Sequence, residues 1–136
     1  MADKIALEIV TPERRVLALG VDEVVMPTVE GYMGVLPGHA PLLALLDVGE
    51  LSYRIGKERH YLTVAKGYAE VLRDSVSIMA ETSEKAEEID LARAERARER
   101  AEKELATRSS DQAFAHAEVR LKKALMRIQT YRRLSG

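Results

Sequence analysis

The 136-residue sequence contains no cysteine, which excludes disulfide bonds, cysteine nucleophiles and cysteine-based zinc sites. It has no tryptophan, one phenylalanine and five tyrosines, so few aromatic rings are available for stacking nucleic-acid bases. No window approaches the roughly 18 uncharged apolar residues that a membrane-spanning helix needs. The N-terminal stretch MADKIALEIV has no basic-then-apolar signal layout and starts directly with strand-like alternation. We therefore expect a protein of a reducing compartment that neither spans a membrane nor binds nucleic acid.

Residues that carry chemistry are also sparse. The three histidines, His39, His60 and His116, lie in separate segments and lack the spacing of metal ligands. The sequence has no G-x-x-x-x-G-K-[ST] motif for nucleotide hydrolysis, and no carboxylate pair or Ser/His arrangement stands out. We expect no catalytic residue, no metal site and no required cofactor.

The net charge of −1 hides an uneven distribution along the chain. Residues 1–89 hold 9 Lys and Arg against 15 Asp and Glu, a net charge of −6, and residues 90–111 hold 6 of each. Residues 112–136 hold 6 basic residues and 1 acidic residue, a net charge of +5. A basic tail on an acidic body favours an acidic partner surface.

Alternation with period two dominates the chain up to about residue 79. The segments KIALEIV and SVSIMA each place three apolar residues on one face, namely Ile5, Leu7 and Ile9, and Val76, Ile78 and Ala80. The tetrapeptides IGKE (55–58) and LRDS (72–75) are typical of tight hairpin connections. Seven or more short strands without helical segments between them predict an antiparallel β-sandwich or flattened barrel.

From about residue 84 the composition changes to strong helix formers. We predict a first helix over residues 90–106 with Asp90 as its N-cap, and a break at TRSSD (107–111). Ser109 and Gln112 form a capping-box signature for a second helix. Its apolar seam is spaced 3, 4, 3, 4, 3 and consists of Phe114, Ala117, Leu121, Ala124, Ile128 and Tyr131. The first helix offers a thinner stripe of Leu91, Ala94, Ala97, Ala101 and Leu105.

These patterns predict an α+β protein in two parts. An N-terminal antiparallel β-sandwich occupies residues 1–86, and a C-terminal two-helix antiparallel hairpin occupies residues 87–136. Alanine buries little apolar area, so at about 25 cal/mol per Å² the seam stabilises the pairing by only a few kcal/mol before ordering costs. We therefore expect a stable body and a movable helical arm.

The stretch GVLPGHAPLLALL (34–46) is the most distinctive part of the body. Pro37 pushes Leu36 into an extended conformation, and Pro37 followed by Gly38 favours a tight turn. One interpretation is a packed loop around a hydrogen-bonded His39. The other is a docking surface, because the stretch has more apolar residues than a turn needs.

Together with EGYMG (30–34), KGYAEVLRDSVSIMAE (66–81) and IDLARA (89–94), this stretch resembles the epsilon subunits of bacterial F-type ATP synthases. The resemblance covers essentially the whole chain, in the right order and at the right length. It implies a ten-stranded β-sandwich in the central rotor stalk, peripheral at the cytoplasmic face of the bacterial plasma membrane. One departure is Lys66, where many relatives carry a second glycine before Gly67.

The resemblance also implies where the sandwich meets its partners. The loop of residues 30–34 would face the c-ring, and the loop of residues 37–42 would lie near the gamma subunit. Tyr32 stands where many relatives have an acidic residue, so the resemblance gives no basis for a contact by charge there. The implied contact positions are Glu30, Gly31 and Tyr32 for the ring, and Pro37, Gly38, His39 and Leu42 for gamma.

Some bacterial relatives bind ATP through the pattern Ile/Leu-Asp-x-x-Arg-Ala and basic residues of the second helix. Here Asp90 can accept hydrogen bonds from adenine or ribose, Ala94 leaves room for a flat base, and Arg93 can neutralise phosphate. Asp90 and Arg93 are equally compatible with an ordinary N-cap and a surface ion pair. Lysine at 123 replaces the arginine of well-binding relatives, and it is a point charge rather than a fork. The positions that the resemblance implies for regulatory ATP are Glu84, Ile89, Asp90, Arg93, Ala94, Arg100, Lys123 and Arg127.

The second helix is strongly basic, with Glu118 as its single acidic companion. A solvated face and a membrane-surface helix are both compatible with this charge, but the apolar side has few large side chains. An acidic protein groove suits it better, and in the family this partner is an acidic segment of the beta and alpha subunits. The basic positions are Arg120, Lys122, Lys123, Arg127, Arg132 and Arg133.

The expected function is therefore that of a non-catalytic rotor subunit that couples rotation to ATP synthesis. Its arm would switch between a retracted, ATP-bound state and an extended state that inhibits ATP hydrolysis. Two other hypotheses stay open at this point. The arm could be a passive brake without a nucleotide response, or the chain could be a free-standing adaptor whose basic hairpin binds an acidic protein or membrane surface.

Overall fold

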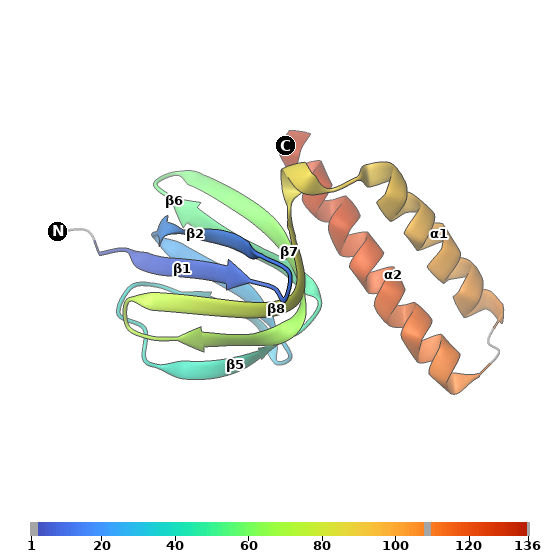
Figure 1. Cartoon of the computed structure of the whole chain (residues 1–136), viewed down its shortest axis with the longest axis horizontal. Coiled ribbons are helices and arrows are strands. Elements are labelled where there is room, and N and C mark those ends of the chain that lie inside the picture. The colour runs from blue at the N-terminus through green and yellow to red at the C-terminus, as the bar shows by residue number, and fades with distance from the viewer. Residues whose placement is uncertain (1–2, 108–109, 136) are drawn as a thin grey trace. The chain divides into compact units, whose positions relative to one another are not determined.

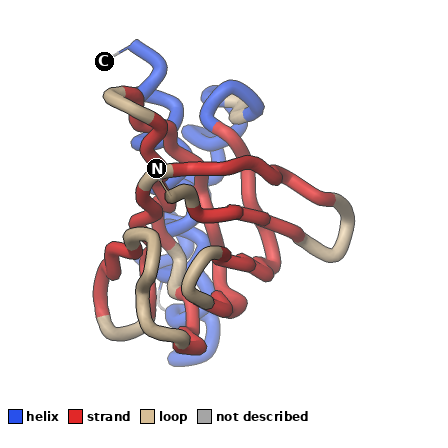
Figure 2. Tube along the Cα trace, turned by 90° about the vertical axis from the view of Figure 1, so that its left-hand side faces the viewer, coloured by secondary structure: helices blue, strands red, loops and turns tan. Residues whose placement is uncertain are grey.

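The computed structural model describes residues 3–107 and 110–135, which form two compact units, one ending at Lys85 and one starting at Ala86 (Figure 1). The first unit consists of strands and the second of helices, as the colours of Figure 2 distinguish. The described strands are β1 (Ile5–Val10), β2 (Arg15–Val21), β3 (Glu23–Thr28), β4 (Gly31–Val35), β5 (Leu42–Leu46), β6 (Gly49–Ile55), β7 (Glu58–Val71) and β8 (Ser75–Lys85). The short 3₁₀ helix η1 (Ala86–Glu88) precedes α1 (Leu91–Thr107) and α2 (Asp111–Arg132), and η2 (Arg133–Ser135) follows them.

The strands form a continuous sheet in the order β2-β1-β8-β7-β5-β3-β4, while β6 pairs with β3 and β7. The α+β class and the sandwich are confirmed. The described strand pairs are antiparallel except for β1 and β8, which run parallel from Ala6 beside Ser75 to Val10 beside Met79. The ten strands that the resemblance implied are eight among the described residues. Part of the difference arises because β7 continues unbroken from its pairing with β6 into its pairing with β5.

The transition within β7 occurs at two residues with positive φ. Lys66 has φ 57° and Gly67 has φ 119°, between Val64, which pairs with β6, and Gly67 itself, which pairs with β5. Left-handed backbone strains any residue with a Cβ. Lys66 therefore adopts a conformation that suits glycine, the residue that the resemblance implied at this position.

The core of the first unit comes from alternate residues of the strands. The faces predicted from β1 and β8 are confirmed, since Ile9 and Ile78 are fully buried and their neighbours at spacing two are almost so. Both predicted hairpins are also confirmed. Gly56 and Lys57 connect β6 to β7, and the Leu72 amide donates to the Ser75 carbonyl at 2.8 Å between β7 and β8.

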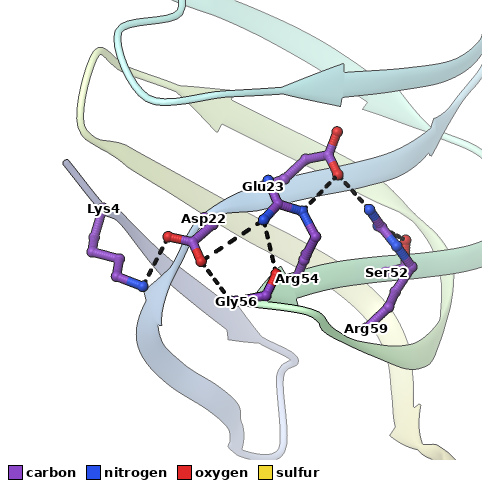
Figure 3. Close-up of polar contacts among 7 residues, drawn as sticks. All are labelled: Lys4, Asp22, Glu23, Ser52, Arg54, Gly56 and Arg59. Carbon is purple, nitrogen blue, oxygen red and sulfur yellow. Dashed lines mark hydrogen bonds and ion pairs between the residues drawn. The ribbon is translucent and has the colours of Figure 1, made fainter. Parts of the chain in front are cut away.

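A network of charged side chains joins the start of β3 to the β6–β7 hairpin (Figure 3). Asp22 accepts from Lys4 Nζ at 2.8 Å and from the Gly56 amide at 2.7 Å. These two donors, and the nearby Arg54, lower the pKa of the Asp22 carboxyl. Glu23 pairs with Arg59 and lies 3.6 Å from Arg54 Nε, and the Arg59 hydrogen bond is the main cause of its lowered pKa.

These lowered pKa values predict an acid-sensitive sandwich. Because both folded-state pKa values lie below the unfolded ones, the stabilisation is fully present above about pH 5 and is lost as the pH falls through the folded values. We expect Glu23→Gln to lower the free energy of unfolding by about 1 kcal/mol at pH 7 and to flatten its decline between pH 5 and 3. Urea unfolding at several pH values measures both. A parallel decline in the variant and the parent would contradict the assignment.

The second unit is an antiparallel helical hairpin (Figure 1). Asp90 is the N-cap of α1 as predicted, since its Oδ1 accepts from the Arg93 amide at 3.1 Å. The predicted capping box of α2 is wrong in its position. Ser109 lies outside the described residues, and the N-cap is Ser110, whose Oγ accepts from the Ala113 amide at 3.0 Å. The helix begins there because the Ser110 carbonyl also accepts from the Phe114 amide.

Most of the buried residues of the two helices are small. In α1 they are Ala94 and Ala101, and the predicted Ala97 is only half-buried. In α2 the predicted Ala117, Ala124 and Ile128 are buried, together with Thr130, which was not predicted. Leu91, Leu105, Phe114, Leu121 and Tyr131 are half-buried at the edges of the seam. A seam of this composition stabilises the pairing only modestly.

Candidate functional site

The start of α1 combines buried apolar residues with exposed charged ones. Ile89 is 5% exposed and Ala94 is fully buried, so both side chains serve packing. Asp90 and Arg93 are exposed. The backbone of Asp90 also contributes, because its carbonyl accepts from the Ala94 amide at 3.0 Å. One Asp90 oxygen is used by the cap, and the carboxylate can still accept further hydrogen bonds.

An ion pair links the two helices, and the short connection between them sets their register. Arg120 of α2 donates to Glu104 of α1. Antiparallel helices advance by about 1.5 Å per residue in opposite directions. Because α1 ends at Thr107 and α2 begins at Asp111, the buried Ala94 of α1 lies about level with the buried Ala124 of α2.

This register groups the candidate phosphate ligands. Arg93 of α1 lies about level with Leu125, between Lys123 and Arg127 of α2, and Arg100 lies about 10 Å further along α1 at 1.5 Å per residue. Lys123 and Arg127 are half-buried, whereas Arg93 and Arg100 are exposed. The hairpin thus places one cationic side chain of α1 level with two of α2.

Glu84, the remaining candidate, belongs to the first unit. It lies on β8 opposite Thr63 of β7, and its amide donates to Thr63 Oγ1 at 3.1 Å. The side chain is half-buried. Ser83 beside it donates from Oγ to the Thr63 carbonyl at 2.7 Å, so the backbone at Glu84 is held firmly.

The basic residues of α2 are spread around the helix. Arg120, Lys122 and Arg132 of α2 are exposed, and so is Arg133 at the start of η2. Arg120 is compensated by Glu104 of the neighbouring helix, a partner that the sequence of α2 by itself did not indicate. This partner lowers the net positive charge that α2 presents while the hairpin is closed.

The β3–β4 connection carries the first candidate contact loop. Thr28 Oγ1 donates to the Gly31 carbonyl at 2.6 Å and accepts from the Glu30 amide at 3.2 Å, and Gly31 has φ 116°. Tyr32 is 61% exposed, yet its hydroxyl accepts from the Glu50 amide at 3.2 Å. Tyr32 is therefore oriented by a hydrogen bond while its ring remains available to a partner.

The second candidate loop, predicted as residues 37–42, corresponds to the β4–β5 connection of residues 36–41, which is hydrogen-bonded to the β7–β8 turn. The Gly38 amide donates to the Arg73 carbonyl at 2.7 Å, and the His39 amide donates to the Leu36 carbonyl at 3.1 Å. His39 Nδ1 lies 2.7 Å from the Ala40 carbonyl. Pro37 is half-buried, and Leu42 begins β5 half-buried beside Val71. This loop is a fixed, partly apolar projection, with Leu36 55% exposed.

An apolar strip on the outer face of the sheet was not predicted as a unit. Leu45 pairs with Tyr68, and Tyr68 pairs with Met79, across β5, β7 and β8. Their exposed fractions are 63%, 42% and 37%, and Leu43 of β5 is 68% exposed. The continuous apolar run LLALL was the signal, since a strand with one solvated face normally alternates apolar and polar residues. Exposed apolar patches of this kind mark interaction surfaces.

The part of the chain that the structure describes has no group of three His, Cys, Asp or Glu residues arranged to hold a metal ion. No described helix is long and apolar enough to cross a membrane.

A β-sandwich with an exposed apolar strip, followed by a helical hairpin with a largely alanine seam, defines a two-unit α+β protein. The family model of the ATP synthase delta/epsilon chain β-sandwich domain matches residues 4–86. The model of the long α-helix domain of the same chain matches residues 87–132. The chain belongs to the ATP synthase delta/epsilon chain family.

Similar proteins support this assignment over nearly the full length. The ATP synthase epsilon chain of Syntrophobacter fumaroxidans is 51% identical over 129 residues, covering 95% of this chain and 96% of the relative. That of a Geobacter species is 47% identical over 130 residues, covering 95% and 94%. Among solved structures, a chain of the Euglena gracilis mitochondrial ATP synthase OSCP/F1/c-ring assembly matches with a TM-score of 0.79 and 25% identity, over 90% of this chain and 78% of that one.

Proposed function

We propose that the chain is a non-catalytic central-stalk subunit of the proton-translocating ATP synthase, peripheral at the cytoplasmic face of the bacterial plasma membrane. It couples rotation to ATP synthesis, and its C-terminal hairpin restrains ATP hydrolysis. The observation that carries the proposal is a helical unit whose seam consists largely of alanine, in a chain of the epsilon family.

The sandwich supplies the constant contacts in this proposal. The strip of Leu43, Leu45 and Tyr68 and the loop at residues 36–41 offer an apolar surface for the gamma subunit. The β3–β4 loop with Tyr32 faces the c-ring. These are apolar contacts, which suit an interface that persists through every rotational step.

The hairpin supplies the switch. In the retracted state α1 and α2 stay paired and hold ATP, with Asp90 toward the nucleoside and Arg93, Arg100, Lys123 and Arg127 toward the phosphates. In the extended state the basic α2 engages an acidic segment of the beta and alpha subunits and blocks rotation in the hydrolysis direction. At a hundredfold excess over Kd, ATP stabilises the retracted state by about 2.7 kcal/mol, which shifts the equilibrium by about two orders of magnitude.

A truncation tests the inhibitory role. We expect the assembled ATPase head to hydrolyse ATP several times faster with a chain ending at Lys85 than with the full chain, because the basic α2 is then missing. Steady-state ATPase rates measure the difference, and co-purification with gamma and the c-ring checks that the truncated chain still assembles. Equal rates in assembled complexes would remove the inhibitory role, and failure of the full chain to co-purify with gamma would favour an adaptor instead.

A further inference from the structure

An arginine occupies the seam between α1 and α2. Leu91, Ala94, Arg98, Ala101 and Leu105 follow the spacing 3, 4, 3, 4, which is the a/d pattern of paired helices. Ala94 and Ala101 are the buried residues of α1, and Arg98 lies between them on the same face.

The guanidinium of Arg98 is poorly satisfied in this position. Its Nε is buried and has no hydrogen-bond partner among the described residues. Glu102 Oε1 lies 3.9 Å from Arg98 Nε, close enough for an ion pair but too far for a hydrogen bond. The side chain as a whole is 35% exposed, so part of it reaches solvent although Nε does not.

A buried donor without a partner destabilises the state in which it is buried, because it loses its hydrogen bonds to water. When the helices separate, water can reach Nε and this cost disappears. Arg98 therefore favours the open hairpin over the closed one, whereas the alanines around it favour the closed hairpin only weakly. In paired helices generally, a single polar residue at a seam position lowers the stability of the pairing while it specifies the register and the number of paired helices.

We propose that Arg98 is a built-in destabilising element that keeps the α1–α2 pairing poised to open. The device acts on the pairing of the two helices themselves and does not depend on nucleotide. The destabilisation comes from the buried Nε that lacks a hydrogen bond, and not from the positive charge that Arg98 shares with the other arginines of α1.

Arg98→Met is the sharpest test. Methionine keeps an unbranched apolar stem and a comparable helix propensity, but it has no guanidinium. Arg96→Met is the matched control, because it removes the same charge from an exposed position of the same helix. Hydrogen exchange of the α1 and α2 amides in the full-length chain, in the absence of ATP, reports the opening of the hairpin.

We expect amides of both helices to exchange about tenfold more slowly in Arg98→Met than in the parent, since removing an unsatisfied donor raises the free energy of opening. Exchange in Arg96→Met should stay within about twofold of the parent, as at other surface positions. Amides of the sandwich should be unchanged in both variants. Equal exchange in the two variants, faster exchange in Arg98→Met, or loss of its helical circular dichroism would each overturn the proposal.

Discussion

Gly67→Ala is expected to lower the free energy of unfolding of the sandwich by about 3–5 kcal/mol. Gly67 has φ 119°, and an added Cβ would lie 1.9 Å from the Met79 carbonyl oxygen and 2.9 Å from the Ala80 Cα. These are backbone atoms, so no side-chain rotation can relieve the overlap. Gly67 pairs with both Leu46 of β5 and Ala80 of β8. Any shift of the backbone at Gly67 therefore disturbs the hydrogen bonds of β7 with both neighbouring strands.

The expected loss is a large fraction of the stability of a small domain, which is typically about 5–15 kcal/mol. Urea unfolding followed by near-ultraviolet circular dichroism measures it, because four of the five tyrosines precede residue 86. Gly31→Ala is the matched control, with φ 116° and no atom within 4 Å of the added Cβ. It should cost only the backbone strain, about 1–2 kcal/mol. Equal losses in the two variants would show that close approach to β8 is not what requires Gly67.

The sequence predicted which residues of the sandwich are buried better than it predicted how the strands pair. Period-two alternation identifies the face of Ile5, Leu7 and Ile9, and these residues are at most 1% exposed. Alternation carries no information about the neighbouring strand, so the parallel pairing of β1 with β8 was not foreseen. Along its length β7 changes its pairing partner from β6 to β5, and this change depends on the backbone at Lys66 and Gly67. A lysine in the sequence gives no signal of positive φ.

In the helical unit, too, some features were predicted correctly from the sequence and others were not. The cap at Asp90 follows from local chemistry and is confirmed, whereas two adjacent serines made the second cap ambiguous, and Ser110 is the one used. The apolar pattern assigned Ala97 to the seam of α1. It passed over Arg98, because a charged residue is normally placed on the solvent side. The spacing of 3 and 4 around Ala94 and Ala101 was the available signal.

Arg93→Ala is expected to weaken ATP binding to the full-length chain by about tenfold or more, since a charge-assisted hydrogen bond to phosphate contributes about 1.5–3 kcal/mol. The N-cap does not change, because Asp90 accepts from the backbone amide of residue 93 and not from its side chain. Alanine is also the best helix former, so α1 should be at least as stable as before. Calorimetric titration with ATP measures the dissociation constant.

Two further variants separate a phosphate contact from the general positive potential of the hairpin. Arg96→Ala removes an exposed charge one turn away on α1 and should change the dissociation constant by less than about twofold, because exposed charges are screened. Arg127→Ala should weaken binding as Arg93→Ala does, since the proposed site draws on both helices. If Arg93→Ala and Arg127→Ala bind ATP as tightly as the parent, the nucleotide does not occupy this hairpin. If the parent itself gives no heat at millimolar ATP, the arm is a brake that responds to its protein partners alone.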